Sequence, residues 1–209
     1  MRVDKIILKA ALSTLAAIGV LCVVLLATMC LLFPQTMMRV TYDMGMNSLS
    51  IHFASVSYDR SGEAYYAAFA TEVSIGADYY DQTEYFGEKL IADDGFEVYC
   101  QSKNDSLPET VTMTYQQYIY GQVCLAKYNQ GKTSEAVQRA FEYTGQAFPR
   151  NNPSAVVMIA AMSAGDTASV NAALTKMQAM KTQITLSQTE GAYLAEMIAL
   201  ATEWTGNQS

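Results

Sequence analysis

Side chains that could carry out acid–base or metal chemistry are sparse in this sequence. It contains one histidine, His52, so we expect neither a histidine-dependent catalytic triad nor a metal site built from several histidines. The adjacent carboxylates Asp93 and Asp94 stand beside a glycine in a short polar stretch and lack the oxygen-ligand spacing of a calcium loop. The chain has no glycine-rich phosphate loop, CxxC pair or nucleophile elbow. We therefore expect no catalytic residue, no metal ligand and no cofactor, and a protein that is not an enzyme.

The acidic residues are concentrated in one part of the chain, which carries a formal net charge of −7. Between residues 59 and 109, twelve acidic side chains stand against three basic ones, a net charge of −9, whereas from residue 110 onward six of each balance. Binding to phosphates requires clustered Lys and Arg, so nucleic acid is not an expected partner. A cationic protein or peptide would suit the acidic part. Repulsion from anionic lipid head groups, or chance, would also account for the clustering.

The N-terminal part of the chain is apolar over a length that suits a membrane. From Ala10 to Phe33 there are 24 uncharged residues, which as a helix would extend about 36 Å and cross a bilayer. A cleavable signal peptide has a shorter apolar region, of about 7–15 residues. We therefore expect residues 6–33 to be an uncleaved transmembrane helix in the lipid bilayer.

The basic residues around this segment predict its orientation. Arg2, Lys5 and Lys9 precede or open the apolar run, and Arg39 is the one basic residue close to its other end. Because positive charge stays on the cytoplasmic side, residues 1–5 are expected in the cytoplasm. The protein would be a single-pass protein of the cell membrane, with residues 34–43 as a tether and residues 44–209 as an extracytoplasmic domain.

The remainder of the chain has helical periodicity interrupted by short polar links. Residues 110–149 show it best, with two amphipathic segments on either side of Gly131. Similar links contain Gly62, Gly95 and Gly165, so the four glycines are 33, 36 and 34 residues apart. We expect helical hairpins over residues 44–75, 79–103, 110–148 and 153–181. A closing helix over 186–204 is expected to begin with a capping box formed by Ser187 and Glu190.

A period near 34 residues with one glycine turn per unit resembles the tetratricopeptide repeat over residues 44–182. The third unit places Tyr120, Val123 and Ala136 on the family's aromatic, leucine and alanine positions. The second unit departs most, with Glu88 at the small-residue position. The resemblance implies an all-α fold, in which the transmembrane helix is followed by a superhelix of about four hairpins and a C-terminal capping helix.

The resemblance also implies a function in protein–protein interaction. In that family the first helix of each unit lines a concave groove that binds a protein or peptide, here with a cationic partner favoured by the charge. The implied partner-binding residues, including those of the acidic links, are His52, Asp59, Tyr85, Lys89, Asp93, Asp94, Tyr118 and Tyr128. We interpret the protein as a membrane-anchored scaffold or adaptor. Two alternatives stay open: a structural subunit packed permanently in a membrane complex, and an enzyme with an unfamiliar carboxylate-based site.

Cys100 and Cys124 fall on consecutive helices of neighbouring units, both on inward faces. An extracytoplasmic setting permits a disulfide between them. Two buried free thiols are the alternative, because cysteine is common at small packing positions.

The orientation makes a direct prediction. Protease added to intact cells or spheroplasts should digest the chain beyond Pro34 and spare the N-terminus. Digestion of the C-terminal domain only after lysis would reverse the orientation and the location of the domain.

Overall fold

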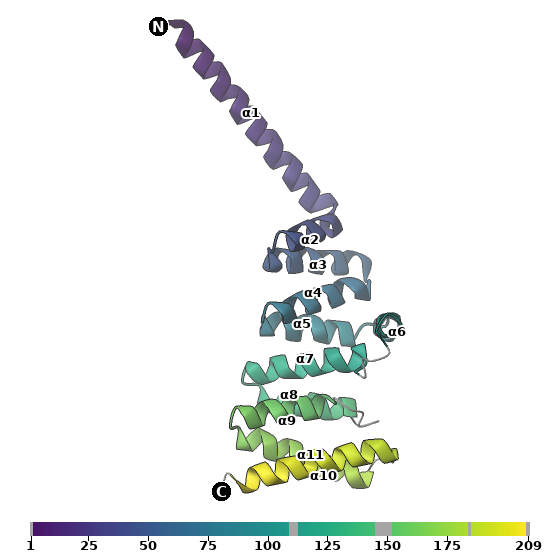
Figure 1. Cartoon of the computed structure of the whole chain (residues 1–209). Helices are drawn as coiled ribbons and strands as arrows, with labels where there is room; N and C mark the ends of the chain where they lie inside the picture. Colours follow the sequence, from purple (N-terminus) through teal and green to yellow (C-terminus); the bar gives the residue numbers. More distant parts are fainter. Residues whose placement is uncertain (1, 109–112, 145–151, 184, 208–209) are drawn as a thin grey trace. The chain divides into compact units, whose positions relative to one another are not determined.

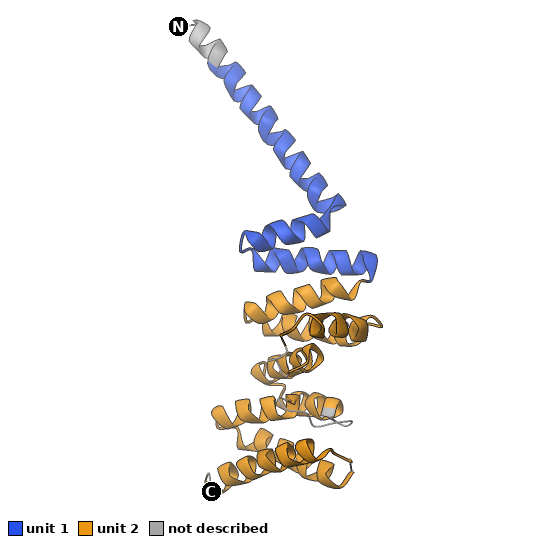
Figure 2. Cartoon of the chain, turned by 45° about the vertical axis from the view of Figure 1, so that its right-hand side comes forward, with its two compact units in different colours: residues 1–62 blue, residues 63–209 orange. Residues whose placement is uncertain are grey.

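The structure, a computed structural model, describes residues 2–108, 113–144, 152–183 and 185–207. Within these residues it contains helices and no strands (Figure 1). The helices are α1 (Arg2–Leu32), α2 (Pro34–Asp43), α3 (Asn47–Ser61), α4 (Ala64–Gly76), α5 (Tyr80–Ile91), α6 (Phe96–Asn104), α7 (Tyr115–Asn129), α8 (Thr133–Thr144), α9 (Pro153–Ser163), α10 (Thr167–Gln183) and α11 (Gln188–Gly206). The predicted all-α class is confirmed. The chain divides into two compact units, Met1–Gly62 and Glu63–Ser209 (Figure 2).

The first unit begins with the long apolar helix α1. Its stretch Leu8–Leu32 covers 25 residues with a mean hydropathy of 2.8, and none of its most apolar window is buried in the protein. This helix is long and apolar enough to span a membrane, as the sequence predicts.

The segment that we expected to be a tether, residues 34–43, is instead the helix α2, packed against α3. Pro34 occupies its first turn, where a missing N–H group costs no hydrogen bond. Met38 is fully buried, and its carbonyl accepts a hydrogen bond of 3.0 Å from the Ser50 hydroxyl in α3. Gly45 has a φ of 72°, which lets the chain reverse between the two helices.

The second unit is built from helices that pack on their neighbours. Helix α5 packs against α4 and α7, α7 packs against α8 and α9, and α10 packs against α9 and α11 (Figures 1 and 2). Helix α6 departs from the predicted hairpin over residues 79–103, because it packs against α7 and α4 instead of returning along α5. Gly131 and Gly165 have the positive φ values of 78° and 72° that a reversal needs, but Gly95 has a φ of −83°.

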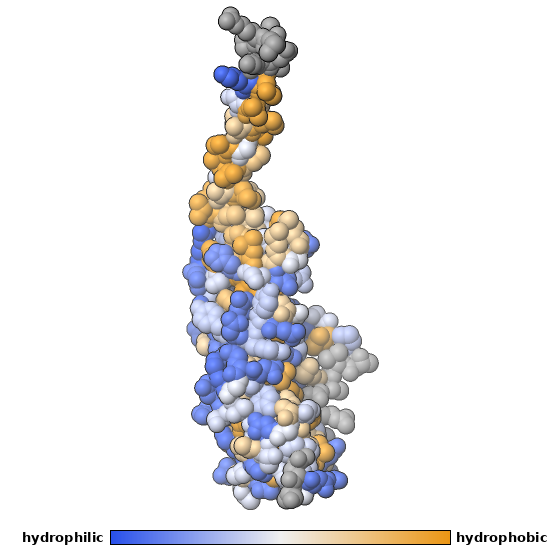
Figure 3. Space-filling view, turned by 90° about the vertical axis from the view of Figure 1, so that its left-hand side faces the viewer, coloured by the Kyte–Doolittle hydropathy of each residue, from blue (hydrophilic) through white to orange (hydrophobic). Residues whose placement is uncertain are grey.

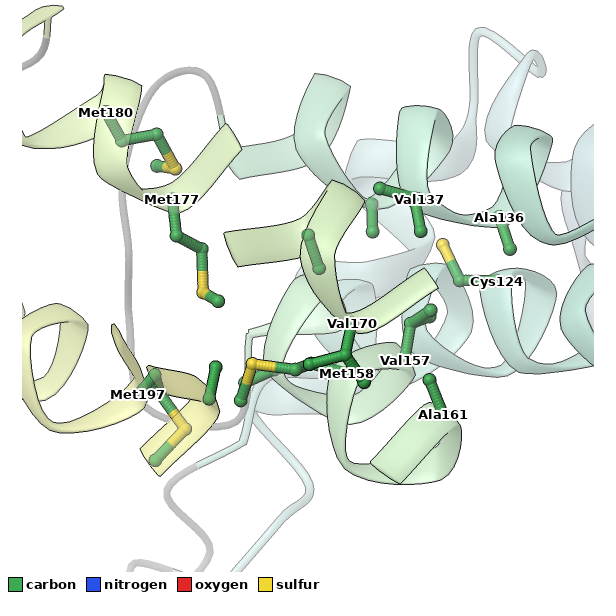
Figure 4. Packing of buried hydrophobic residues seen from close by; sticks show 14 of the residues in the cluster. Cys124, Ala136, Val137, Val157, Met158, Ala161, Val170, Met177, Met180 and Met197 are labelled. Atoms are coloured by element: carbon green, nitrogen blue, oxygen red, sulfur yellow. The ribbon is translucent and has the colours of Figure 1, made fainter. Parts of the chain in front are cut away.

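The core of the C-terminal half is rich in methionine. Met158, Met177 and Met180 are fully buried and lie among the ribbons of the last helices (Figure 4). Unbranched methionine fills irregular gaps between helices that cross at varied angles. Helix α11 packs on α10 and buries Leu194, and its start has the predicted capping box of Ser187 and Glu190.

Cys100 and Cys124 are both buried and both free. Burial raises the pKa of each thiol to about 12. The structure therefore has the two buried thiols and not the disulfide.

Helix α5 approaches α7 closely at Gly87. A Cβ atom on Gly87 would fall inside the van der Waals radius of the Val123 Cγ2 atom. The sequence analysis placed the small-residue position of the repeat at Glu88, one residue later. It therefore missed Gly87, the residue that permits this approach. Val123 is fully buried and branched at Cβ, so it has little freedom to move away.

We expect Gly87→Ala to lower the free energy of unfolding by about 1–3 kcal/mol, because the added methyl overpacks the interface. Gly121→Ala in α7 is the matched control, since a Cβ there meets no atom within 4 Å. It should stabilise the protein by up to about 1 kcal/mol through helix propensity. Urea unfolding of the full chain in detergent, followed by circular dichroism, compares the two. Equal effects of both substitutions would contradict the close approach.

Candidate functional site

An extensive arrangement of charged side chains joins α5 to α7 in the second unit. Glu84 and Glu88 lie one turn apart on α5, and the ammonium group of Lys127 from α7 reaches both. Its Nζ lies 2.9 Å from Glu84 Oε1 and 3.3 Å from Glu88 Oε1. The side chains of Lys127 and Glu84 are only 11% and 15% exposed. Each charge therefore needs the other to offset the cost of its removal from water.

Residues after α7 complete the pairing. Lys132 Nζ lies 2.6 Å from Glu84 Oε2, and the Gln130 side-chain amide donates to the same oxygen at 2.8 Å. Arg139 of α8 pairs with Glu88 and lies over the Tyr120 ring, with 5.4 Å between its Cζ atom and the ring centroid. We call Glu84, Glu88, Lys127, Lys132 and Arg139 the ion-pair network.

The network holds Glu84 in its ionised form. Burial acts to raise the pKa of this carboxyl, but hydrogen bonds from the two lysines and from Gln130 outweigh it. The pKa of Glu84 therefore lies below its usual value of 4.5. For Lys127, burial acts to lower the pKa, but the hydrogen bond and charge of Glu84 and the charge of Glu88 outweigh it and raise the pKa. Both groups are charged at neutral pH.

A cleft of about 580 Å³ opens beside the network. Its lining consists of Asp81, Glu84, Tyr85, Glu88, Lys89, Ala92, Gln130 and Lys132. Tyr85 is 54% exposed, which is unusual for an aromatic ring in a cleft. The Lys89 ammonium group lies 4.9 Å from the centre of this ring, a cation–π contact. The cleft thus presents an aromatic face next to carboxylates, with a cation already seated on that face.

A smaller hollow of about 280 Å³ adjoins the cleft through Glu88. It is lined by Glu88, Lys127, Glu135, Gln138, Arg139 and Glu142. Its walls pair with one another: Arg139 Nη1 lies 3.3 Å from Glu142, and Lys127 Nζ lies 3.7 Å from Glu135. We regard it as the outer part of the ion-pair network.

A second polar cluster connects α4, α6 and α7. Glu72 accepts hydrogen bonds from the Tyr115 hydroxyl at 2.6 Å and from Lys103 Nζ at 3.3 Å. Lys103 Nζ also lies 5.5 Å from the centre of the Tyr99 ring. Burial, followed by the Glu72 carboxylate, raises the pKa of the Tyr115 hydroxyl. These contacts hold α6 in place.

Of the eight predicted partner-binding residues, the structure brings Tyr85 and Lys89 together in the cleft. Asp93 and Asp94 lie in the α5–α6 link, where Asp93 Oδ1 accepts a hydrogen bond of 2.8 Å from the Gly95 amide. Asp94 is exposed.

Like Asp93 and Asp94, the other four predicted residues do not line the cleft. Tyr118 and Tyr128 are half-buried towards opposite ends of α7. The pKa of Tyr128 is raised by burial and by the nearby Asp166 at the start of α10. His52 and Asp59 are exposed on α3 in the other unit.

The sequence analysis missed Asp81 and Glu84 in the cleft, although it contained a signal for them. Asp81, Glu84, Tyr85, Glu88 and Lys89 recur at intervals of three and four residues, which places them on one side of a helix. The cations that pair with Glu84 and Glu88, from Lys127, Lys132 and Arg139, are 39 to 51 residues away along the chain, and no local pattern connects the two sets.

The ion pairs also account for part of the uneven charge. Glu84 and Glu88 belong to the acidic stretch 59–109, and the cations that neutralise them come from the later, balanced part. Exposed carboxylates elsewhere in the stretch keep its surface acidic: Asp59, Glu63, Asp78, Asp81, Asp94, Glu97 and Asp105. Among the residues whose placement is known, no three His, Cys, Asp or Glu side chains are arranged to hold a metal ion.

The network predicts a stability difference that depends on pH. Glu84→Gln should lower the free energy of unfolding at pH 7 by roughly 2 kcal/mol, because Lys127 loses its closest carboxylate. The folded pKa of Glu84 is depressed, so its contribution is fully present above the usual value of 4.5 and is lost as pH falls through the folded pKa. The difference in free energy of unfolding between wild type and Glu84→Gln should therefore shrink as the pH falls below 4.5.

Glu203→Gln on α11 is the control, because this side chain is exposed. It should change stability by less than about 0.5 kcal/mol at either pH. Urea unfolding at several pH values measures all three proteins, and a gap for Glu84→Gln that does not vary with pH would contradict the pairing.

The chain matches no protein-family model, no curated protein and no solved structure.

Proposed function

We propose that the protein is a membrane-anchored adaptor whose helical domain binds a basic segment of a partner protein outside the cytoplasm. The observation that carries this proposal is the cleft on α5, which is lined by the exposed Tyr85 ring and by the exposed carboxylate of Asp81. In this proposal α1 is the anchor, and the helices that follow form a stack similar to tetratricopeptide repeats.

The anchor and its orientation rest on the apolar length of α1 and on the charges at its N-terminal end. Arg60 Nη1 donates a hydrogen bond of 2.9 Å to the carbonyl of Leu31 and so adds a positive charge at the other end. Arg60 follows the end of α1 by 28 residues, beyond the 15–20 residues or so over which flanking charge directs insertion. Folding brings it there, so Arg2, Lys5 and Lys9 still favour a cytoplasmic N-terminus.

The cleft suits a lysine or arginine side chain better than an anion or an apolar group. Lys89 shows how a cation can bind here, because its ammonium group lies over the Tyr85 ring. A partner's cation would take the place of Lys89, whose flexible side chain can swing out towards water. Asp81, exposed at the edge, would supply the opposing charge. A cation over an aromatic ring contributes about 0.5–2 kcal/mol, depending on its desolvation.

The alternatives have less support. A permanently packed structural subunit needs a contiguous apolar surface. Among the described residues of the second unit, the exposed large apolar side chains are spread over several elements: Tyr80, Tyr85, Val98, Leu107, Ile159 and Leu200. An acid–base enzyme needs a carboxyl whose pKa is raised towards neutrality. The Glu84 pKa is shifted in the opposite direction.

Peptide binding tests the proposal. The full chain in lipid nanodiscs is titrated with a fluorescent lysine-rich peptide and with its glutamate-for-lysine counterpart, and binding is followed by anisotropy. The lysine peptide should bind, and raising the salt concentration should weaken binding because surface charges are screened. Tyr85→Ala and Asp81→Lys should each weaken it about tenfold, given the loss of the ring or the reversal of charge.

Two matched variants act as controls. Tyr85→Phe keeps the ring and should bind as wild type, and Glu203→Lys makes the same charge reversal as Asp81→Lys at an exposed site on α11. Equal binding of both peptides, or equal weakening by Asp81→Lys and Glu203→Lys, would show that the cleft does not recognise cations.

A further inference from the structure

Exposed apolar side chains are concentrated immediately after α1. Among the residues described beyond Leu32, twelve large apolar side chains are exposed, and six of them fall within residues 33–49. These six are Phe33, Val40, Tyr42, Met44, Met46 and Leu49. Residues 33–49 therefore carry as many exposed large apolar side chains as all the described residues of the second unit together.

Val40 of α2 and Met44, the residue directly after its end, share one side, whereas the exposed Tyr42 lies about 200° from Val40. Val40 and Met44 are one turn apart, and they are 43% and 63% exposed. The side that packs on α3 is a different one and contains the buried residues Met38 and Thr41. Gln35 is exposed too, but helical spacing places it about 140° or more away from Val40. Helix α2 thus has a buried side, an exposed apolar side and an exposed polar side.

The connection between α1 and the hairpin formed by α2 and α3 is too short for the hairpin to lie far from a bilayer that α1 spans. Helix α1 ends at Leu32 and α2 begins at Pro34, with only Phe33 between them. The Arg60 guanidinium also ties the end of α3 to the Leu31 carbonyl. Helix α2 extends about 15 Å, and the head-group layer on each side of a bilayer is about 5–8 Å thick.

The arrangement within the first unit agrees with this constraint. Helix α2 turns away from the direction of α1 and crosses beneath its end (Figure 1). Apolar surface continues from α1 onto the part of the unit directly beneath it (Figure 3).

We propose that the α2–α3 hairpin lies on the lipid surface where α1 leaves the bilayer, with Val40 and Met44 inserted at the boundary between head groups and acyl chains. This inference rests on the proposed function in one respect, that α1 spans the membrane. The bilayer acts as a docking surface that fixes the start of the domain at the membrane.

Tryptophan quenching tests this placement. The one native tryptophan, Trp204, is replaced by phenylalanine, and Val40→Trp, Met44→Trp or Gln35→Trp is introduced singly into the full chain. In vesicles with bromine on the upper acyl chains, Val40→Trp and Met44→Trp should be quenched at least about twofold more than Gln35→Trp. Gln35→Trp should instead be quenched more by acrylamide added to the water. Circular dichroism confirms that each variant retains its helices.

A fourth variant separates this inference from the anchor. Leu25→Trp lies within α1 and should be quenched strongly by lipid brominated deep in the acyl chains. If it is quenched while Val40→Trp and Met44→Trp behave like Gln35→Trp, the hairpin does not lie on lipid although α1 spans the bilayer. Protection of Val40→Trp from both lipid and aqueous quenchers would mean that protein covers this side, and would also overturn the inference. An unquenched Leu25→Trp would refute the anchor itself.

Discussion

The close contact between α5 and α7 is the constraint on which the candidate site depends. Gly87 lets the backbone of α5 approach Val123 so closely that no side chain fits between them. At that separation Lys127 of α7 lies within 2.9–3.3 Å of both Glu84 and Glu88. A larger residue at position 87 would push α5 away from α7 and lengthen these ion pairs. The Lys127 side chain already contacts both carboxylates and could not extend to follow them. Packing and charge pairing at this interface therefore stabilise each other.

The same helix divides its carboxylates between structure and surface. Glu84 and Glu88 are neutralised by Lys127, Lys132 and Arg139, so they hold helices together and contribute little to the field outside. Asp81 and the exposed Tyr85 lie on the same side of α5 but at the cleft. The acidity of residues 59–109 thus has two physical causes: internal pairing with cations far along the chain, and an exposed remainder available for a basic partner.

The sequence was sufficient for features that repeat locally. Apolar periodicity and link glycines located most helices of the second unit, and Gly131 and Gly165 have the left-handed backbone that such links need. The sequence was insufficient where contacts between residues far apart in the chain determine whether a helix forms or where it packs. Helix α2 depends on the burial of Met38 by α3, and α6 depends on Glu72 and Tyr115, which hold it against other helices. Tyr85 and Lys89 were identified, but the cleft around them was not, because Gln130 and Lys132 reach it only in the folded protein.

Site-specific photo-crosslinking in the native membrane tests the central claim most directly. A photoreactive amino acid at position 85 should yield a covalent adduct with a protein partner, and an excess of lysine-rich peptide should suppress it. The same amino acid at position 159, where Ile159 is 47% exposed on α9, should yield no adduct that the peptide suppresses. Adducts of equal intensity at both positions, or an adduct at position 85 that the basic peptide leaves unchanged, would contradict recognition of a cationic segment by this cleft.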